Sequence, residues 1–255
     1  MPPPSWLIEL PTCPSTNDWA LAHLGALAHG ACVWTRRQTA GRGRNGARWE
    51  APPGVLTASF VLDLADALDA TRLSLAVGLA ICHAVDDLSP GLDVGLKWPN
   101  DCVIAGRKFA GVLCERPAQR NRVVVGIGLN LDPHWEQDRD SLPLVMGACP
   151  PIGLAEAAPQ RPAPEALAMI VALRRYLVEA CGVLAADAWA TLTPALAARD
   201  WLRGRTLAVE SGGRRVHGIA AGIDADGRLL IDGADGRCAL SSAHVVAVDE
   251  PTIPR

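Results

Sequence analysis

The sequence predicts an α+β protein in which a domain with a mixed sheet and flanking helices precedes a smaller all-β part. First, residues 13–30 and 70–88 repeat apolar side chains with a helical period. Second, short β-type runs gather between residues 93 and 131 without the regular alternation of a parallel α/β fold. Third, from about residue 204 the chain changes to short β-type runs separated by glycine-rich turns.

The first predicted helix has a defined start, because Ser15, Thr16 and Asn17 are residue types that cap helices. Gly30 offers a stop for this helix. The runs ACVWTRRQ and GVLTASFVLDL favour strands, and the long amphipathic helix over 70–88 follows them. The other predicted elements are strands within 93–99, 108–115 and 122–131, a loop over 131–163, and helices near 164–181 and 184–198.

The C-terminal part is predicted to be a small, barrel-like β module. Its β-type runs are separated by SGG, DADG and DGADG, which are sequences typical of tight turns. The expected division of the chain is therefore a large domain over 1–203 and the β module over 204–255.

Composition and charge exclude several classes of protein. The chain has a globular composition, and its net charge of −3 gives no overall attraction to nucleic acid or anionic membranes. The eight cysteines contain no CxxC pair and the six histidines have no metal-binding spacing, so neither a disulfide framework nor a metal site is expected. Because there is neither a signal peptide nor an apolar run of about eighteen residues, the expected location is the cytoplasm.

The stretch QTAGRGRNGARWEAPPG contains the spacing GxGxxG at Gly41, Gly43 and Gly46. In a nicotinamide oxidoreductase of the Rossmann type, a helix follows this spacing and its N-terminus receives a pyrophosphate. Here two prolines and a glycine follow instead, which excludes such a helix, and the Gly-Lys-Ser/Thr of a Walker loop is missing too. Five arginines and no acid lie within residues 36–48, so the segment favours a flexible cationic loop for an anionic phosphate. A solvated basic surface loop is the alternative.

Further residues are candidates for the same site. Lys97, in KWPND, is one of only two lysines in a chain with twenty-two arginines. The use of lysine here favours a function that needs a compact positive charge. The alternative is an ordinary surface turn. Gly111, Gly126 and Gly128 interrupt predicted strands and mark either a bulge or a ligand lying flat against the backbone. Asn130 either binds a ligand or caps its strand.

Five motifs together resemble the biotin–protein ligases. STN at 15–17, QTAGRGRNGARW at 38–49, KWPND at 97–101, RKFAGVLCE at 107–115 and VGIGLNL at 125–131 occur in the order of that family. The pair GRGRxG and KWPND is the most specific part, and the resemblance covers most of the chain. It implies a catalytic domain with the fold of class II synthetases and biotin/lipoate ligases, followed by an SH3-like β-barrel.

The resemblance also implies a two-step reaction. Biotin and MgATP give biotinyl-5′-adenylate and pyrophosphate, and a lysine of a biotin carboxyl carrier protein domain, such as that of acetyl-CoA carboxylase, then displaces AMP. Because the attacking carboxylate is already ionised, the site needs cations more than a general base. A lid-like glycine loop would shield the adenylate from water.

Roles carry over to single residues by the same resemblance. The STN residues 15–17 and Gln38 match the biotin head-group site. Lys97 matches the lysine that bridges the biotin carboxylate and the α-phosphate, and Arg44 is expected to retain the adenylate. The expected substrate-binding residues are Ser15, Thr16, Asn17, Gln38, Gly41, Arg42, Gly43, Arg44, Lys97, Gly111 and Asn130, with Lys97 and Arg44 also expected to be catalytic.

Other matched positions concern the surroundings of the ligand. Gly111 resembles the strand behind the biotin rings, and Asn130 resembles a contact on the phosphate or adenine side. The loop 131–143 takes the place of the family's adenylate-side loop, where Trp135 is a candidate cover for the adenine. The match begins at residue 15, which leaves no room for a DNA-binding domain, so neither DNA binding nor a repressor function is expected. Monomer and homodimer are both left open.

Two other functions compete with this interpretation. A lipoate–protein ligase uses the same adenylation chemistry but is expected to show an RRxSGGG-type loop, where this chain has GRGRNG. A non-catalytic module that holds biotin or a nucleotide has no need of Lys97 beside an arginine loop, since storage requires no charge neutralisation at phosphorus. Both alternatives are disfavoured.

Overall fold

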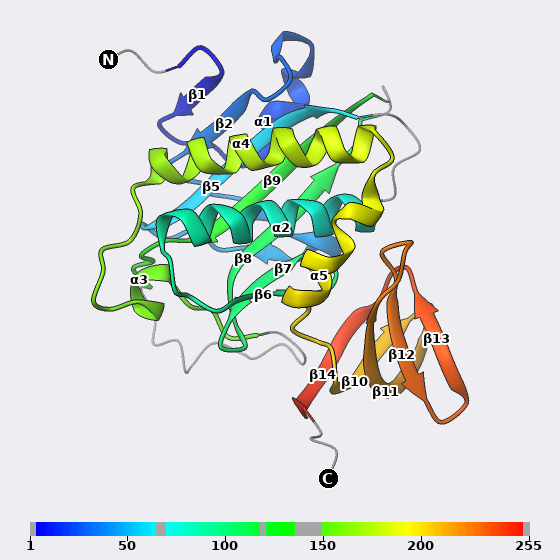
Figure 1. Ribbon diagram of the computed structural model, residues 1–255. Coiled ribbons are helices and arrows are strands. Elements are labelled where there is room, and N and C mark those ends of the chain that lie inside the picture. Colours follow the sequence, from blue (N-terminus) through cyan, green and yellow to red (C-terminus); the bar gives the residue numbers. More distant parts are fainter. Residues whose placement is uncertain (1–3, 65–69, 118–120, 136–148, 252–255) are drawn as a thin grey trace.

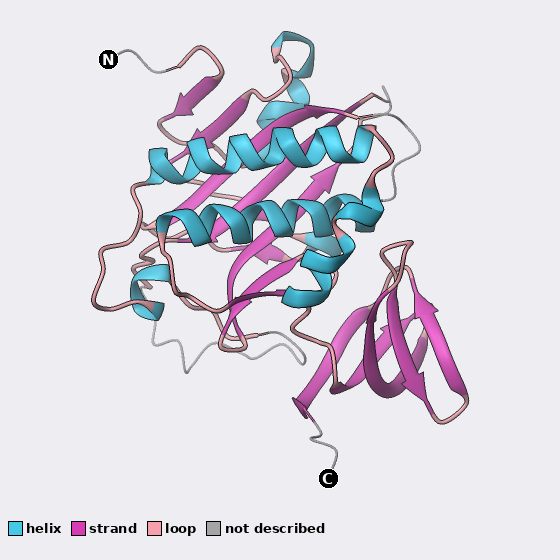
Figure 2. Ribbon diagram, viewed as in Figure 1, coloured by secondary structure: helices cyan, strands magenta, loops and turns pink. Residues whose placement is uncertain are grey.

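The computed structural model describes residues 4–64, 70–117, 121–135 and 149–251. In these residues, one large sheet with its helices forms the first part of the molecule, and a second, smaller sheet forms the C-terminal part (Figure 1, Figure 2). The α+β class expected from the sequence is confirmed.

The large sheet is built, within the described residues, from β1 (Leu7–Leu10), β2 (Cys32–Thr35), β5 (Val55–Asp63), β6 (Val94–Lys97), β7 (Asp101–Ile104), β8 (Arg107–Glu115) and β9 (Arg122–Asn130). Its strand order is β1-β2-β5-β9-β8-β7-β6. β1 runs parallel to β2, and all other neighbours are antiparallel. The sheet is therefore mixed, as predicted.

Two long helices, α2 (Ala70–Leu88) and α4 (Ala166–Ala185), lie side by side across one face of this sheet (Figure 1). The short helix α1 (Thr16–Ala22) packs on the opposite face. Its N-cap is Ser15, as predicted, whose side chain accepts a hydrogen bond from the backbone N–H of Asp18. The other described α-helices are α3 (Leu154–Ala157) and α5 (Thr193–Arg199).

β5 contributes to the cores on both sides of the sheet, because successive side chains of a strand point to opposite faces. Phe60 and Leu62 lie in the main core with α2 and α4, whereas Val61 between them lies in a smaller core with α1. Thr57 and Ser59 share the alternation of Val61 and therefore also face the α1 side. The candidate site is built on this side.

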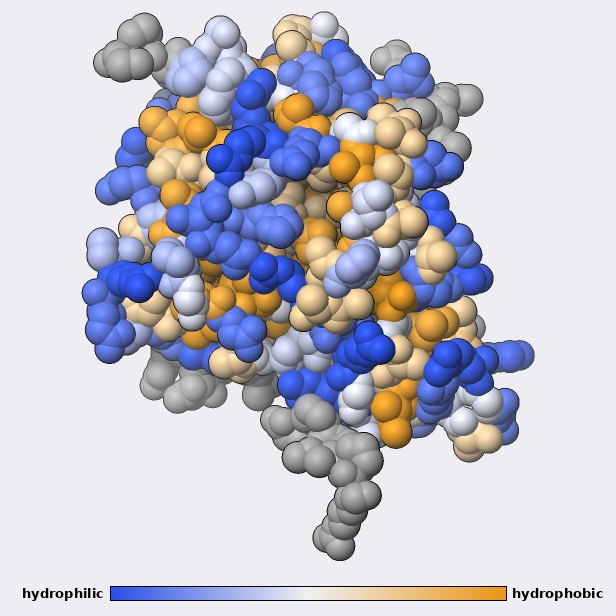
Figure 3. Space-filling model, in the orientation of Figure 1, coloured by the Kyte–Doolittle hydropathy of each residue, from blue (hydrophilic) through white to orange (hydrophobic). Residues whose placement is uncertain are grey.

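The face formed by α2 and α4 has hydrophobic residues interspersed with hydrophilic ones (Figure 3). α4 leaves about half of Leu167 and Val171 exposed and buries Met169, Leu173 and Leu177 in the main core. This is the amphipathic pattern of a helix that covers a sheet. None of the helices that the structure describes combines the length and apolarity needed to cross a bilayer.

The structure corrects several predicted helix boundaries. The helix predicted over 13–30 is only α1, followed by a 3-10 turn over Leu24–Ala26, because Gly25 disfavours a continuous helix there. The helices predicted near 164–181 and 184–198 are α4 and α5, the first longer and the second shorter than expected.

Two strands of the large sheet and one short helix are missing from the sequence prediction. β1 has four residues, and its parallel pairing with β2 defines it as a strand. β7 begins at Asp101, a residue whose sequence context is equally typical of a turn, and pairing with β6 and β8 decides its conformation. α3 lies in the predicted loop 131–163, of which residues 136–148 are outside the described residues.

The C-terminal module is all-β, as predicted. Its described strands are β10 (Arg205–Ser211), β11 (Arg214–Ile223), β12 (Leu229–Gly233), β13 (Gly236–Leu240) and β14 (His244–Pro251). All pairs are antiparallel in the order β13-β12-β11-β10-β14, so β13 and β14 form the two edges. In the SGG turn, Gly212 and Gly213 both have positive φ (57° and 77°), the conformation of tight hairpins. The domain boundary at 203/204 stays a prediction.

The β module is attached to the large domain through the turn before β12. Trp98 Nε1 donates a hydrogen bond to the carbonyl of Gly227 at 3.0 Å, and Arg72 Nη2 contacts Asp226 Oδ1 at 2.7 Å. Trp98 is 1% exposed. The KWPND segment, which carries Lys97, therefore contacts the module directly.

Asp200 lies in the connection between α5 and β10. The N–H of Leu202 donates to Asp200 Oδ1 at 3.1 Å, whereas Oδ2 is buried without a hydrogen-bond partner. Burial raises the pKa of Asp200 to about 6, although the hydrogen bond from Leu202 and the charge of Arg203 oppose the rise. The folded protein thus binds this proton more tightly than the unfolded chain, so this group makes stability fall as pH rises from about 4 to above 6.

We expect Asp200→Asn to remove this pH-dependent loss of stability. Above pH ~7 the variant should gain about 1–3 kcal/mol of unfolding free energy over the wild type, with partial solvent exposure reducing the full effect of the pKa difference. Near pH ~4, where the wild-type carboxyl is largely protonated when folded, the difference should nearly vanish. Urea unfolding of the variant and the wild type at both pH values measures this difference in unfolding free energy. A difference of equal size at the two pH values would contradict the role given to Asp200.

Candidate functional site

A cavity of about 630 Å³ opens on the α1 side of the large sheet. Its walls come from the start of α1, the glycine-rich segment, strands β5, β8 and β9, the KWPND segment and the start of β14. Segments far apart in the sequence therefore meet around one space.

The floor of the cavity lacks side chains where three strands meet. In the sheet register, Gly128 of β9 pairs with Thr57 of β5 on one side and with Gly111 of β8 on the other. Gly126 lies in the next row, paired with Ser59. Because glycine has no side chain, other groups can lie directly on the backbone here.

Two of these glycines are covered by side chains from other segments of the protein. A Cβ built on Gly126 would be 2.4 Å from Asn17 Oδ1, and one built on Gly128 would be 2.2 Å from the indole of Trp49. The sequence predicts that these glycines mark either a β-bulge or a backbone surface on which a ligand lies. In the structure, the side chains of Asn17 and Trp49 occupy the space above Gly126 and Gly128. Trp49 Nε1 is buried without a hydrogen-bond partner in the described structure.

We expect Gly128→Ala to displace the Trp49 indole, because the new methyl group would overlap its ring. Overpacking of this kind costs about 1–3 kcal/mol of stability. The indole N–H resonance of Trp49, assigned with Trp49→Phe, should shift in an NMR spectrum. Gly25→Ala is the matched control, since nothing lies within 4 Å of a Cβ at that position. An unchanged Trp49 resonance in Gly128→Ala would refute this packing.

One end of the cavity, the polar end, is lined by Thr16, Asn17 and Gln38, with Ser59 buried behind them. Gln38 Oε1 accepts a hydrogen bond from the backbone N–H of Thr16 at 3.0 Å. Ser59 Oγ lies 2.7 Å from Thr16 Oγ1 and 2.6 Å from Asn17 Oδ1. Ser59 is fully buried and was not predicted as a site residue; its signal was a hydroxyl, like that of Thr57, inside a largely apolar strand. These fixed donors and acceptors suit a small ring with N–H and C=O groups.

The glycine-rich segment is a hairpin. β3 (Gly41–Arg42) pairs with β4 (Arg48–Trp49), and a 3-10 turn over Arg44–Gly46 joins them. The N–H of Gly43 donates to the carbonyl of Ala47 at 2.7 Å. The expected flexible loop with exposed glycine N–H groups is therefore wrong at Gly43, because cross-strand pairing uses that group. Strands β4 and β5 follow this turn where a Rossmann turn would open a helix, which agrees with the rejection of a Rossmann turn.

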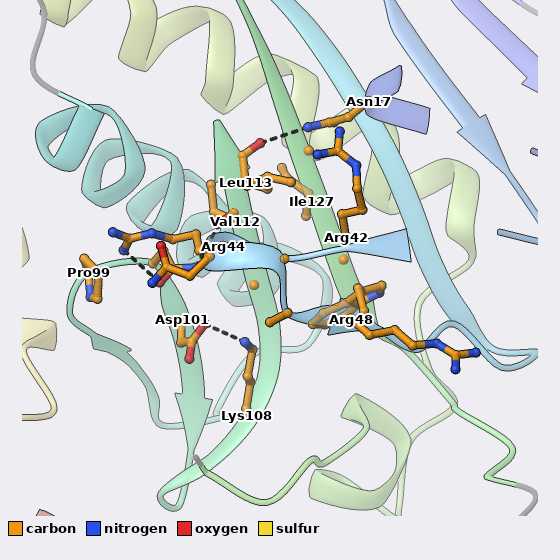
Figure 4. Close-up of a pocket in the computed structure, with 18 of the residues that line it drawn as sticks. Asn17, Arg42, Arg44, Arg48, Pro99, Asp101, Lys108, Val112, Leu113 and Ile127 are labelled. Carbon is orange, nitrogen blue, oxygen red and sulfur yellow. Dashed lines mark hydrogen bonds and ion pairs between the residues drawn. The ribbon is translucent and has the colours of Figure 1, made fainter. Parts of the chain in front are cut away.

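The three arginines of the hairpin point in different directions (Figure 4). Arg42 extends toward Asn17, and Arg48 extends away from the other two. Arg44 turns toward the KWPND segment, where its Nη1 donates to Asn100 Oδ1 at 3.3 Å. Thus Arg44 places its positive charge near the KWPND segment, whereas Arg42 places its charge near the start of α1.

The other end of the cavity, the cationic end, contains Arg44, Lys97 and Lys108. Lys97 is 5% exposed and ends β6. Lys108 Nζ contacts Asp101 Oδ1 at 2.6 Å (Figure 4). It also lies 5.4 Å from the centre of the Trp49 ring. Lys108 was not among the predicted site residues, although it is the other of the chain's two lysines.

Lys97 is also next to a cysteine thiol. Burial raises the pKa of Cys149, and the nearby Lys97 ammonium, which donates a hydrogen bond to the thiol, opposes this rise. The thiol is therefore protonated at neutral pH and does not cancel the charge of Lys97.

Most of the predicted site residues come together in this cavity. Its wall includes Ser15, Thr16, Asn17, Gln38, Arg42, Gly43, Arg44, Lys97 and Gly111. Gly41 lies behind the wall, where a Cβ would be 2.5 Å from the carbonyl of Trp49. His244 of β14 also lines the cavity, and no local sequence signal could have indicated this, because only domain packing brings it there.

Besides Gly41, two predicted contacts are not in the described wall. Asn130 is 2% exposed, and its amide donates to the carbonyls of Lys108 and Ile152 at 3.3 and 3.1 Å, so it ties β8 to the segment before α3. Trp135 is not among the lining residues, and most of the loop 131–143 lies outside the described residues. In the part of the chain described, no cluster of three metal-ligating side chains occurs, and all eight cysteines are free.

Fold and cavity define a class of protein: an α+β domain with an appended β module and a cavity large enough for a small molecule. The polar end offers a complementary surface for a ring with N–H and C=O groups. The cationic end offers compensation for negative charge.

Comparison with known proteins gives the family. The model of the Biotin/lipoate A/B protein ligase family matches residues 9–132, and that of the Biotin protein ligase C terminal domain matches residues 204–247. The biotin–[acetyl-CoA-carboxylase] ligase of Paracoccus denitrificans is 32% identical over 238 residues, covering 91% of this chain and 96% of the relative. The ligase of the same name from Mycobacterium tuberculosis is 34% identical over 250 residues, covering 91% and 85%.

Solved structures agree on the fold. The biotin protein ligase of Aquifex aeolicus in complex with biotin and ATP superposes with a TM-score of 0.82 at 22% identity, covering 94% of this chain and 97% of that one. This chain belongs to the biotin protein ligase family.

Proposed function

We propose that this protein activates biotin with ATP to biotinyl-5′-adenylate and transfers biotin to a lysine of a biotin carboxyl carrier protein domain. The observation that carries the proposal is a single cavity in which Asn17 of the polar end and Lys108 of the cationic end lie on opposite sides (Figure 4). Biotin has the matching shape, with a ureido ring at one end and a carboxylate at the other. The relatives from P. denitrificans and M. tuberculosis are named as ligases for acetyl-CoA carboxylase, which makes its carrier domain the first acceptor to test.

In the first step, a biotin carboxylate oxygen attacks the α-phosphorus of ATP. A new P–O bond forms, the bond to the bridging oxygen breaks, and pyrophosphate leaves with its electron pair. Negative groups approach one another, so fixed cations lower the barrier more than a base would. In this proposal Lys97 and Lys108 neutralise the reacting centre, and Arg44 holds the adenylate. The Trp49 indole provides an aromatic surface beside Lys108.

Mg²⁺ enters, in this proposal, as a substrate bound to ATP. Magnesium commonly keeps several waters and binds substrate phosphates with one or two carboxylates. Asp101 lines the cavity and is paired with Lys108, so it is the carboxylate nearest to this chemistry. In the second step, a carrier lysine attacks the acyl carbon, an amide forms, AMP leaves and the amine loses a proton.

The test is a transfer assay with purified protein, biotin, MgATP and an apo carrier domain. We expect a mass increase on one carrier lysine that requires ATP and releases pyrophosphate and AMP. Lipoate in place of biotin should leave the carrier unmodified. Transfer of lipoate would favour the lipoate ligases, and tight binding of biotin without pyrophosphate release would favour a storage module.

A further inference from the structure

Both terminal nitrogens of the Arg42 side chain are paired with carboxylates. Its Nη1 and Nη2 each lie 3.1 Å from Glu115 Oε1, and Nη2 is also 3.0 Å from Glu115 Oε2. Nη2 additionally contacts Asp18 Oδ1. Such multiple charge-assisted hydrogen bonds fix the direction of a guanidinium group. The hydrogen bonds of Arg42 are therefore directed at Asp18 and Glu115.

These ion pairs join three parts of the molecule. Arg42 belongs to the glycine hairpin, Asp18 to the first turn of α1, and Glu115 to the end of β8. Glu115 Oε2 also accepts a hydrogen bond from Asn17 Nδ2 at 2.8 Å, which links the ion pairs to the polar end. The hairpin is thereby attached to the elements that form the head-group side of the cavity.

The attachment is partly exposed to solvent, with side-chain exposures of 41% for Arg42, 55% for Asp18 and 24% for Glu115. Ion pairs of this exposure are weak and reversible individually, so they can open when a ligand enters or leaves. The opposite side of the hairpin is held differently, by Arg44 on Asn100 at 3.3 Å.

We propose that Asp18 and Glu115 form a carboxylate clamp on Arg42 that keeps the glycine hairpin closed over the polar end and slows the departure of biotin. The inference rests on the proposed function. It makes Arg42 a positioning residue: its side chain binds the clamp, and biotin benefits because the hairpin is in place.

The test measures biotin dissociation directly, by chasing labelled biotin from the full-length protein. We expect Arg42→Ala to speed dissociation about tenfold and Asp18→Asn about threefold to tenfold, as for loss of a charge-assisted pair. The maximal rate of adenylate formation at saturating biotin should change less than about twofold in Asp18→Asn, because Asp18 is not among the residues that line the cavity. Arg42→Lys should recover part of the slow dissociation, since it keeps the charge without the bidentate fork.

A double substitution separates the clamp from independent effects. In the Arg42→Ala background, Asp18→Asn should have no further effect, because its partner is already gone. Glu9→Gln is the matched control: it breaks the exposed pair with Arg36, at 2.9 Å, and should leave dissociation unchanged.

Two outcomes would overturn the clamp: unchanged dissociation in Arg42→Ala, or equal acceleration by Asp18→Asn in both backgrounds. If Arg42→Ala does not fold, Arg42→Lys and Asp18→Asn decide by the same comparison. A wild-type protein that binds no biotin would instead refute the proposed function, so the two failures are distinguishable.

Discussion

Replacement of Lys97 with alanine is expected to lower the rate of pyrophosphate release by about 10²–10³-fold, the usual effect of removing one preorganised group that stabilises transition-state charge. Biotin affinity should change much less, because the polar end, which we propose recognises the ring, is untouched. Single-turnover pyrophosphate release and equilibrium binding of biotin measure the two quantities. Adenylate formation at near wild-type rate would contradict the role of Lys97.

Lys108→Ala is the necessary companion, because the structure places both lysines in the same cavity. If both ammonium groups neutralise the reacting centre, each substitution should slow adenylate formation strongly, and the double variant should lose less than the product of the two effects. If Lys108→Ala has a large effect and Lys97→Ala has none, we would assign the bridging role to Lys108. Lys97, which is 5% exposed and hydrogen-bonded to Cys149, would then have a structural role.

Arg44→Gly is expected to release the adenylate from the site about 10–100-fold faster, since one or two charge-assisted hydrogen bonds to an anion are worth a few kcal/mol. Escaped biotinyl-adenylate is a reactive mixed anhydride, so biotin should appear on lysines of a bystander protein such as serum albumin. Mass spectrometry of the bystander and a chase of labelled adenylate provide the readout.

Two further substitutions control this experiment. Arg44→Ala should behave like Arg44→Gly if the lost charge is the cause, whereas only the glycine variant should leak if added backbone freedom in the turn is the cause. Arg44→Lys should retain the adenylate in part. Tight retention by all three would mean that Arg44 does not hold the intermediate.

Lys97 and Ser15 illustrate what local sequence could predict. KWPND and the GRGRxG spacing are short, so a resemblance to biotin–protein ligases was visible without any structure. Ser15 was identified as a helix cap because capping depends on the few residues that follow it. The main helices and central strands were found for the same reason, since their apolar periods are local.

Asp101 and Asn130 show where local sequence was insufficient. The residues of NDCVI are equally compatible with a turn, and only pairing with two neighbouring strands makes Asp101 the start of β7. Asn130 ends a glycine-rich strand, and its sequence context was compatible with a ligand contact or a strand cap. In the structure its side-chain amide donates to two main-chain carbonyls. In both cases the deciding partners lie on other segments of the chain.

The sequence by itself determined the α+β class, the family resemblance, and the presence of a polar residue set and a cationic residue set, because these depend on composition, period and contiguous motifs. Only the tertiary structure decided that Arg42 turns to Asp18 and Glu115 while Arg44 turns to Asn100. It also decided that glycines in β9 make room for Asn17 and Trp49. The physical reason is that strand register and side-chain direction follow from long-range packing, which adjacent residues do not encode.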